Sequence, residues 1–257
     1  MKDELGIDHP FTITTSAKLS YIYSRVNRYA EAEAIETEVL KQRTRLLGVD
    51  HRDTIEALAN LAVSRHALGH FAEAEKLLDK VLKQSTAILG DDHPVTIKIS
   101  SNLAKAYVRL GRYTEAKVLQ LQNLERSTKI LGADHPATIG ESADLADTYH
   151  VLCRWTEAEE LTIKVLKQRT RLLGTDHPDT IGISSTLGKI YHALCRYAEA
   201  ETIFTTVLKQ NIGALGIDHP SSIEASSHLA CTYCALGRYA EAEALHLENL
   251  ERKVKIL

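Results

Sequence analysis

Hydrophobic residues recur along the chain at the spacing of an α-helix. Between positions 97 and 110 they are separated by steps of 3, 3, 1, 3 and 3, which forms one stripe on a helix and excludes a strand. The stripe consists of Ile97, Ser100, Leu103, Ala104, Tyr107 and Leu110. Pro94 stands at the expected first turn, where its missing N–H costs nothing. Either His93 or Asp92 is expected to cap this helix, and Gly111 ends it.

A second helix is predicted directly after Gly111. Its apolar positions are Tyr113, Ala116, Leu119, Leu124 and Ile130. Glu115 near its start and Lys129 near its end suit the helix macrodipole, and Leu131-Gly132 closes it. This part of the chain therefore predicts a hairpin of two helices.

The same hairpin pattern recurs with a period of 42 residues. Leu-Gly occurs at 5, 47, 89, 131, 173 and 215, and Asp-His follows it each time. We expect a single solenoid over 5–256, made of repeats 5–46, 47–88, 89–130, 131–172, 173–214 and 215–256, with Leu257 as the start of a truncated seventh repeat. Repeats 3 and 6 share Asn-Leu-Glu-Arg where the other four have Val-Leu-Lys-Gln, which indicates a duplicated unit of three repeats.

A single hairpin cannot bury both of its apolar stripes, so neighbouring repeats must stack. The predicted fold class is all-α, an α-solenoid of six two-helix repeats with about twelve helices. A recurring alanine is expected to let the two helices approach closely, and the aromatic residue three positions before it is expected to fill the turn. The alanines are Ala32, Ala74, Ala116, Ala158, Ala200 and Ala242, and the aromatics are Tyr29, Phe71, Tyr113, Trp155, Tyr197 and Tyr239.

The third repeat resembles the tetratricopeptide repeat (TPR). The resemblance rests on Leu103-Ala104, Tyr107, Leu110-Gly111-Arg112-Tyr113 and Glu115-Ala116. The period of 42 residues and the LGxDHPxT linker are similar to the subclass found in kinesin light chains and in fungal NB-ARC or NACHT sensor proteins. This resemblance implies a superhelix that binds protein segments on the concave surface lined by the first helix of each repeat.

The predicted groove lies on the side of the first helices that is turned away from the core stripe. Aligned positions there vary most between repeats, as a surface adapted to an irregular ligand would, although drift on an ordinary solvated helix face gives the same pattern. The candidate groove residues are Lys18, Tyr21, Arg25, Asn60, His66, Lys98, Asn102, Lys105, Arg109, Asp144, Asp147, His150, Lys189 and His192. The first half of this set is basic, which favours an acidic peptide. The kinesin light chain resemblance points to the same ligand class.

Catalytic and metal chemistry has little support in the sequence. Six of the twelve histidines belong to the repeated Asp-His pair and are expected to cap helices. His228, Cys231 and Cys234 are a weak zinc candidate at helical spacing, and no metal or cofactor is expected. The chain contains no phosphate-binding G-x-x-x-x-G-K-S/T loop, GxSxG elbow or HExxH helix, so we expect no enzyme.

Composition narrows the class of partner. The formal net charge is −3, from 31 basic and 34 acidic residues, which argues against nucleic-acid binding. No apolar run reaches the roughly 20 residues of a spanning helix, and the four cysteines fit a reducing compartment, so we expect a cytoplasmic protein. Uncapped ends predict head-to-tail self-association. The leading hypothesis is a non-catalytic interaction scaffold, and the alternative is the sensing or autoinhibitory arm of a larger NLR-like signalling NTPase.

Overall fold

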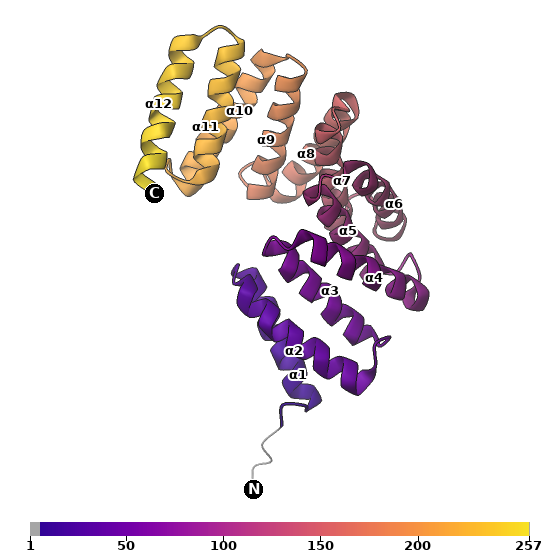
Figure 1. Cartoon of the computed structure of the whole chain (residues 1–257). Helices are drawn as coiled ribbons and strands as arrows, with labels where there is room; N and C mark the ends of the chain where they lie inside the picture. The colour runs from indigo at the N-terminus through magenta and orange to yellow at the C-terminus, as the bar shows by residue number, and fades with distance from the viewer. Residues whose placement is uncertain (1–5, 257) are drawn as a thin grey trace. The chain divides into compact units, whose positions relative to one another are not determined.

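The regular elements within residues 6–256, the part of the chain that the computed structural model describes, are all α-helices (Figure 1). The first helices of the repeats are α1 (Pro10–Arg25), α3 (Arg52–Ala67), α5 (Pro94–Arg109), α7 (Pro136–Val151), α9 (Pro178–Ala193) and α11 (Pro220–Ala235). The second helices are α2 (Tyr29–Leu47), α4 (Phe71–Leu89), α6 (Tyr113–Leu131), α8 (Trp155–Leu173), α10 (Tyr197–Leu215) and α12 (Tyr239–Ile256). Every helix starts in step with the Leu-Gly markers, so the predicted fold class is confirmed. Leu5 and Leu257, the outer limits of the predicted repeats, lie outside the described residues.

The chain divides into two compact units, Met1–Ile130 and Leu131–Leu257. Helices pack consecutively from α1 to α5 in the first unit and from α7 to α12 in the second. The division falls at the end of the third repeat, where the sequence indicates a duplicated three-repeat unit. One continuous solenoid across both units stays a prediction.

Each first helix begins at the histidine of the Asp-His pair. The imidazole Nδ1 of His93 accepts a hydrogen bond from the Val95 N–H at 3.2 Å, which satisfies one of the free donors at the helix start. The equivalent histidines cap the other five first helices in the same way, at 3.1 to 3.2 Å. Of the two caps that the sequence left open, histidine is therefore the one used. In repeat 3 the preceding aspartate, Asp92, instead pairs with Lys129 at 3.2 Å.

The second residue after each first helix has a left-handed backbone. Gly69, Gly111 and Gly237 have φ between 75 and 88°, which glycine adopts without steric cost. Cys153 and Cys195 occupy the same position in repeats 4 and 5, with φ of 57 and 59°. A side chain there costs about 1 to 2 kcal/mol, so these two turns carry strain that the glycine turns lack.

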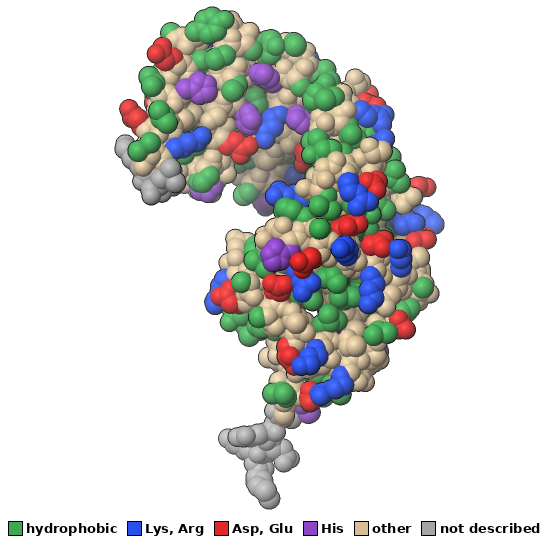
Figure 2. Space-filling view, viewed as in Figure 1, with side chains coloured by type: hydrophobic (Ala, Val, Ile, Leu, Met, Phe, Trp, Pro, Cys, Tyr) green, Lys and Arg blue, Asp and Glu red, His purple; other side chains and the backbone are tan. Residues whose placement is uncertain are grey.

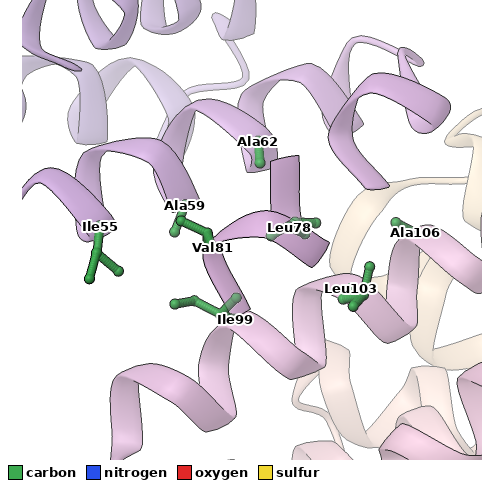
Figure 3. Close-up of a cluster of buried hydrophobic side chains, with 8 residues drawn as sticks. All are labelled: Ile55, Ala59, Ala62, Leu78, Val81, Ile99, Leu103 and Ala106. Carbon is green, nitrogen blue, oxygen red and sulfur yellow. The ribbon is translucent and has the colours of Figure 1, made fainter. Parts of the chain in front are cut away.

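The core lies between neighbouring helices of successive repeats. In the first unit, side chains from α3, α4 and α5 converge on one another (Figure 3). This cluster consists of Ile55, Ala59, Ala62, Leu78, Val81, Ile99, Leu103 and Ala106. The expected close-approach alanines are buried in all six repeats. The recurring aromatic residues were expected to fill the turn between the two helices. This expectation is wrong at Tyr239, whose exposed fraction is 70%, while the other five aromatics are half-buried.

Successive repeats are also joined by arginine–glutamate pairs. Arg112 pairs with Glu75 of the preceding repeat at 3.0 Å, and Arg196 and Arg238 make the equivalent pair at 2.6 Å. The guanidinium of each of these three arginines also lies 4.1 to 4.2 Å from the centre of a tyrosine ring on its own first helix.

Repeat 2 builds the same link from a different position. His70 stands where the other repeats have arginine, and Arg65 stands where they have tyrosine. Arg65 pairs with Glu33 of repeat 1 at 2.9 Å. The two exchanged residues therefore restore the link together.

Candidate functional site

The candidate site is the surface made by the first helices of neighbouring repeats, which we call the first-helix face. First helices contact one another directly, α3 with α5 in the first unit, and α7 with α9 and α9 with α11 in the second. The predicted groove residues are divided between the two units. Lys18, Tyr21, Arg25, Asn60, His66, Lys98, Asn102, Lys105 and Arg109 belong to the first unit, and Asp144, Asp147, His150, Lys189 and His192 to the second.

The first-helix face of the first unit is basic. Lys18 and Arg25 on α1 and Lys98 and Arg109 on α5 are exposed. No carboxylate forms an ion pair with any of these four cations among the described residues. By contrast, the arginines that precede the second helices, such as Arg112, are held by glutamates.

An aromatic ring supports the α5 end of this basic surface. The Arg109 guanidinium lies 4.8 Å from the centre of the Phe71 ring, and the His66 ring meets Phe71 edge-on at 5.1 Å. Burial lowers the pKa of His66, and the charges of Arg109 and Lys105 lower it further. His66 therefore favours its neutral form beside two cations.

The first-helix face of the second unit has paired charges of both signs. Lys189 on α9 pairs with Glu224 on α11 at 3.0 Å, and Glu224 lies 3.5 Å from His228. The bond from Lys189 lowers the pKa of Glu224. The Asp147 carboxylate accepts a hydrogen bond from Thr186 at 3.2 Å. Although part of Asp147 reaches solvent, the protein around the carboxyl group disfavours its charge and raises its pKa.

The histidines of this face have a packing role that the sequence did not predict. His150 meets Trp155 edge-on at 5.0 Å, and His192 meets Tyr197 at 5.3 Å. Each ring therefore supports the aromatic residue that opens the second helix of its own repeat. Repeat 6 has Cys234 in place of the histidine. Figure 2 shows histidine side chains gathered over the helices of the second unit.

A cavity of about 290 Å³ opens on the second unit between α9, α10 and α11. Its lining residues are Asp176, Pro178, Ile181, Gly182, Ser185, Lys189, Val207, Asn211, Ala214, Leu215, Ser221, Glu224 and Ala225. Of the predicted groove residues, Lys189 alone lines it. A Cβ at Gly182 would meet nothing within 4 Å, so the missing side chain is part of the opening. The signal available in the sequence was a glycine inside a helix, at the position of Lys98 and Glu224 in other repeats.

The metal candidate is not assembled. No group of three or more His, Cys, Asp or Glu side chains within 6–256 is placed to hold a metal ion. His228 instead stacks on Phe204, with ring centres 5.2 Å apart, and burial lowers its pKa. Cys231 and Cys234 are exposed free thiols. None of the described helices is long and apolar enough to cross a membrane.

Comparison with known proteins agrees with this architecture. Tetratricopeptide repeat models match residues 12–53, 53–120, 140–209 and 179–253, which together cover most of the chain. No curated protein matches the chain in sequence.

Solved structures with the same fold include relatives of the kinesin light chain. A Podosopora anserina putative kinesin light chain with nearly identical TPR-like repeats is 27% identical, with a TM-score of 0.68 over 80% of this chain and 98% of that one. BtubC (BKLC) from P. vanneervenii is 22% identical, with a TM-score of 0.71 over 87% and 90%. A Signal Transduction ATPase with Numerous Domains from Pyrococcus horikoshii, which has a tetratricopeptide repeat sensor, is 15% identical, with a TM-score of 0.66 over 94% and 36%.

TPR proteins are generally non-catalytic scaffolds that bind proteins or peptides. The repeat period, the helix pairs and the matches to family models agree on one conclusion, that this chain belongs to the tetratricopeptide repeat family.

Proposed function

We propose that this protein is a non-catalytic scaffold whose first-helix face in the first unit binds an acidic segment of a partner protein. The observation that carries the proposal is the contrast between two sets of cations. Arginines before the second helices are neutralised by glutamates, whereas Lys18, Arg25, Lys98 and Arg109 have no carboxylate partner among the described residues. Cations without partners on one surface raise the local concentration of an anionic ligand and give it charge-assisted hydrogen bonds.

The test compares charge reversal on the first-helix face with charge reversal elsewhere. The double variant Lys98→Glu with Arg109→Glu is expected to weaken binding of a fluorescent peptide rich in glutamate, with one tryptophan, by about 100-fold, because each charged hydrogen bond contributes about 1.5 kcal/mol or more. The control is Lys76→Glu with Lys80→Glu, two exposed positions on α4. Equal binding by both variants would disprove the proposal.

A second candidate function is the sensing arm of a larger signalling NTPase. The specific observation is the fold shared with the Pyrococcus horikoshii ATPase, in which the tetratricopeptide repeats are the sensor. A nucleotide-binding loop in the same natural gene supports this role, and a gene that encodes repeats alone argues against it.

We also propose head-to-tail self-association of the chain. Phe11 and Ile22 are exposed on α1, and Leu247, Leu250 and Val254 are exposed on α12. Apolar residues at both ends of a stack favour contact between copies. Light scattering at rising concentration should show an increase in mass that Leu247→Glu with Leu250→Glu abolishes, and a mass that stays that of a monomer would refute the contact.

A further inference from the structure

In repeats 1, 3 and 4 an ion pair holds the end of the second helix to the loop before the first helix of the same repeat. Arg171, in the last turn of α8, pairs with Asp134 at 2.8 Å, and Lys129 pairs with Asp92 at 3.2 Å. Arg45 pairs with Asp8 in repeat 1. In three repeats, therefore, a cation from this turn is bound by the aspartate of the Asp-His pair.

Repeat 5 has lost this cation and the apolar residue beside it. Gly213 stands where repeat 4 has Arg171, and Ala214 stands where repeat 4 has Leu172. Asp176, the equivalent aspartate, accepts a hydrogen bond from Gln210 at 3.0 Å and has no ion pair among the residues that the structure describes.

The bond from Gln210 leaves room for a cation. In repeat 4 the equivalent Gln168 donates to Asp134 at 2.9 Å while Arg171 binds the same carboxylate. Both partners lower the pKa of Asp134, with Arg171 the larger cause. Asp176 therefore has the surroundings of an arginine-binding aspartate without the arginine.

The missing side chains leave a depression of about 680 Å³ on α10, which we call the α10 notch. It is lined by Asp176, Thr205, Thr206, Lys209, Gln210, Gly213 and Ala214. Thr205 and Thr206 are also smaller than their repeat 4 equivalents, Ile163 and Lys164. Four neighbouring positions have thus lost volume together.

Two features of the repeats argue that the notch suits a cationic side chain. Lys209 lies on the rim of the notch, but its positive charge does not prevent a second cation from binding. Repeat 4 has the equivalent Lys167, and Arg171 still binds Asp134 there. Repeat 2 also lacks the cation, since it has Ala87, but it keeps the bulky Ile88. Loss of both the cation and its apolar neighbour is specific to repeat 5.

We propose that the α10 notch binds an arginine side chain and an adjacent apolar side chain of a partner protein. The guanidinium pairs with the free oxygen of Asp176, and its planar fork matches a carboxylate better than an ammonium does. The apolar neighbour covers Ala214, where four other described repeats have Leu46, Ile88, Ile130 and Leu172. The site lies on one unit and does not depend on the first-helix face of the other.

The probe is acetyl-Arg-Leu-amide, which copies the sequence of Arg171-Leu172, added to the ¹⁵N-labelled full chain. Saturable shifts of the backbone amide signals of Gly213 and Ala214, with a Kd of roughly 1 mM, are expected. The neutral analogue acetyl-citrulline-Leu-amide should bind at least about tenfold more weakly, because it has no charge for Asp176. Equal binding of the two probes, or no saturable shift up to about 20 mM, would overturn the proposal.

Two paired variants separate a site from a surface effect. Gly213→Arg with Ala214→Leu restores the residues of repeat 4, so it should fold and lose the probe. Arg171→Gly with Leu172→Ala, combined with Ile163→Thr and Lys164→Thr, should create a second site beside Asp134, seen as new shifts in α8. Retained binding in the first variant would refute the proposal. Shifts at the notch that appear without probe, on raising the protein concentration, would assign it to a second copy of the chain instead.

Discussion

The two units build different surfaces from the same hairpin. In the first unit the exposed cations Lys98 and Arg109 have no carboxylate partner within the described residues, whereas in the second unit Lys189 is held by Glu224. The positions that form the hairpin, such as the capping histidines and the buried alanines, are shared by both. Binding chemistry in this fold therefore depends on a few variable positions, which can change without disturbing the positions that stack the repeats.

The largest expected effect concerns how the two units fill the same core position. Leu78 and Phe204 are equivalent and both fully buried, and Phe204 fits because repeat 5 has Gly188 where repeat 2 has Ala62. A Cβ at Gly188 would lie 2.8 Å from the Phe204 ring. Gly188→Ala should therefore destabilise the chain by about 2 to 3 kcal/mol in urea unfolding, despite the higher helix propensity of alanine.

The same comparison supplies a second-site test. Gly188→Ala with Phe204→Leu recreates the packing of repeat 2 and should recover most of the lost free energy. If the double variant is as unstable as Gly188→Ala alone, the clash with Phe204 is not the cause.

Glu36 occupies the position of Leu78 in repeat 1, where it is a buried carboxylate. Burial raises the pKa of Glu36, so the folded state favours the protonated form of its carboxyl group. At neutral pH the charged carboxylate therefore destabilises the folded state. Glu36→Leu should stabilise the chain by about 2 kcal/mol at pH 7.

The pH dependence distinguishes this cause from simple packing. Because the pKa of Glu36 is higher in the folded state than in the unfolded state, the buried charge destabilises the wild type fully at pH values above the folded pKa. This destabilisation disappears as the pH falls below the pKa of Glu36 in the unfolded state. The gain from Glu36→Leu in urea unfolding should shrink between pH 7 and pH 4. An equal gain at both values would exclude the buried charge as its source.

Removing Glu224 should make the second unit resemble the first. Glu224→Gln frees Lys189 and leaves an uncompensated cation on the first-helix face. Binding of the glutamate-rich peptide to the second unit should rise about tenfold, from one added charged contact. The measurement is peptide anisotropy in the Lys98→Glu, Arg109→Glu background, with Glu243→Gln, an exposed position on α12, as the control.

The smallest expected effect concerns the turns after the first helices. The second unit places Cys153 at φ +57°, where the first unit has Gly69 and Gly111 in the equivalent turns. Cys153→Gly should stabilise the chain by about 1 kcal/mol, measured by the urea midpoint. Asn27→Gly should change it by less, because asparagine tolerates this backbone better.

The helices and their ends follow from the sequence because each depends on local chemistry. The Leu-Gly and Asp-His markers predict where every described helix begins and ends, and the steps of three and four predict which side is buried. The sequence left the capping residue open, since His93 and Asp92 are both suitable. The structure selects histidine in all six first helices, including α9, where Asp176 has no ion pair among the described residues.

The candidate site was only partly predictable, because it depends on contacts across repeats. Variable positions identified Lys189, but its partner Glu224 and the cavity beside Gly182 depend on the packing of α9 against α11. The packing of His150 on Trp155 likewise depends on how the helix pair turns. The peptide-binding role of the predicted residues stays a prediction.

The link between repeats 1 and 2 bears on how such arrays diverge. Arg65 and His70 replace tyrosine and arginine as a pair, so the guanidinium reaches Glu33 from the other side of the turn. A crossover between gene segments that falls between these two codons would leave a daughter repeat with two guanidinium groups or with none. A repeat with only one of the two changes would therefore differ from its neighbours in the number of cations that can reach the glutamate of the preceding repeat.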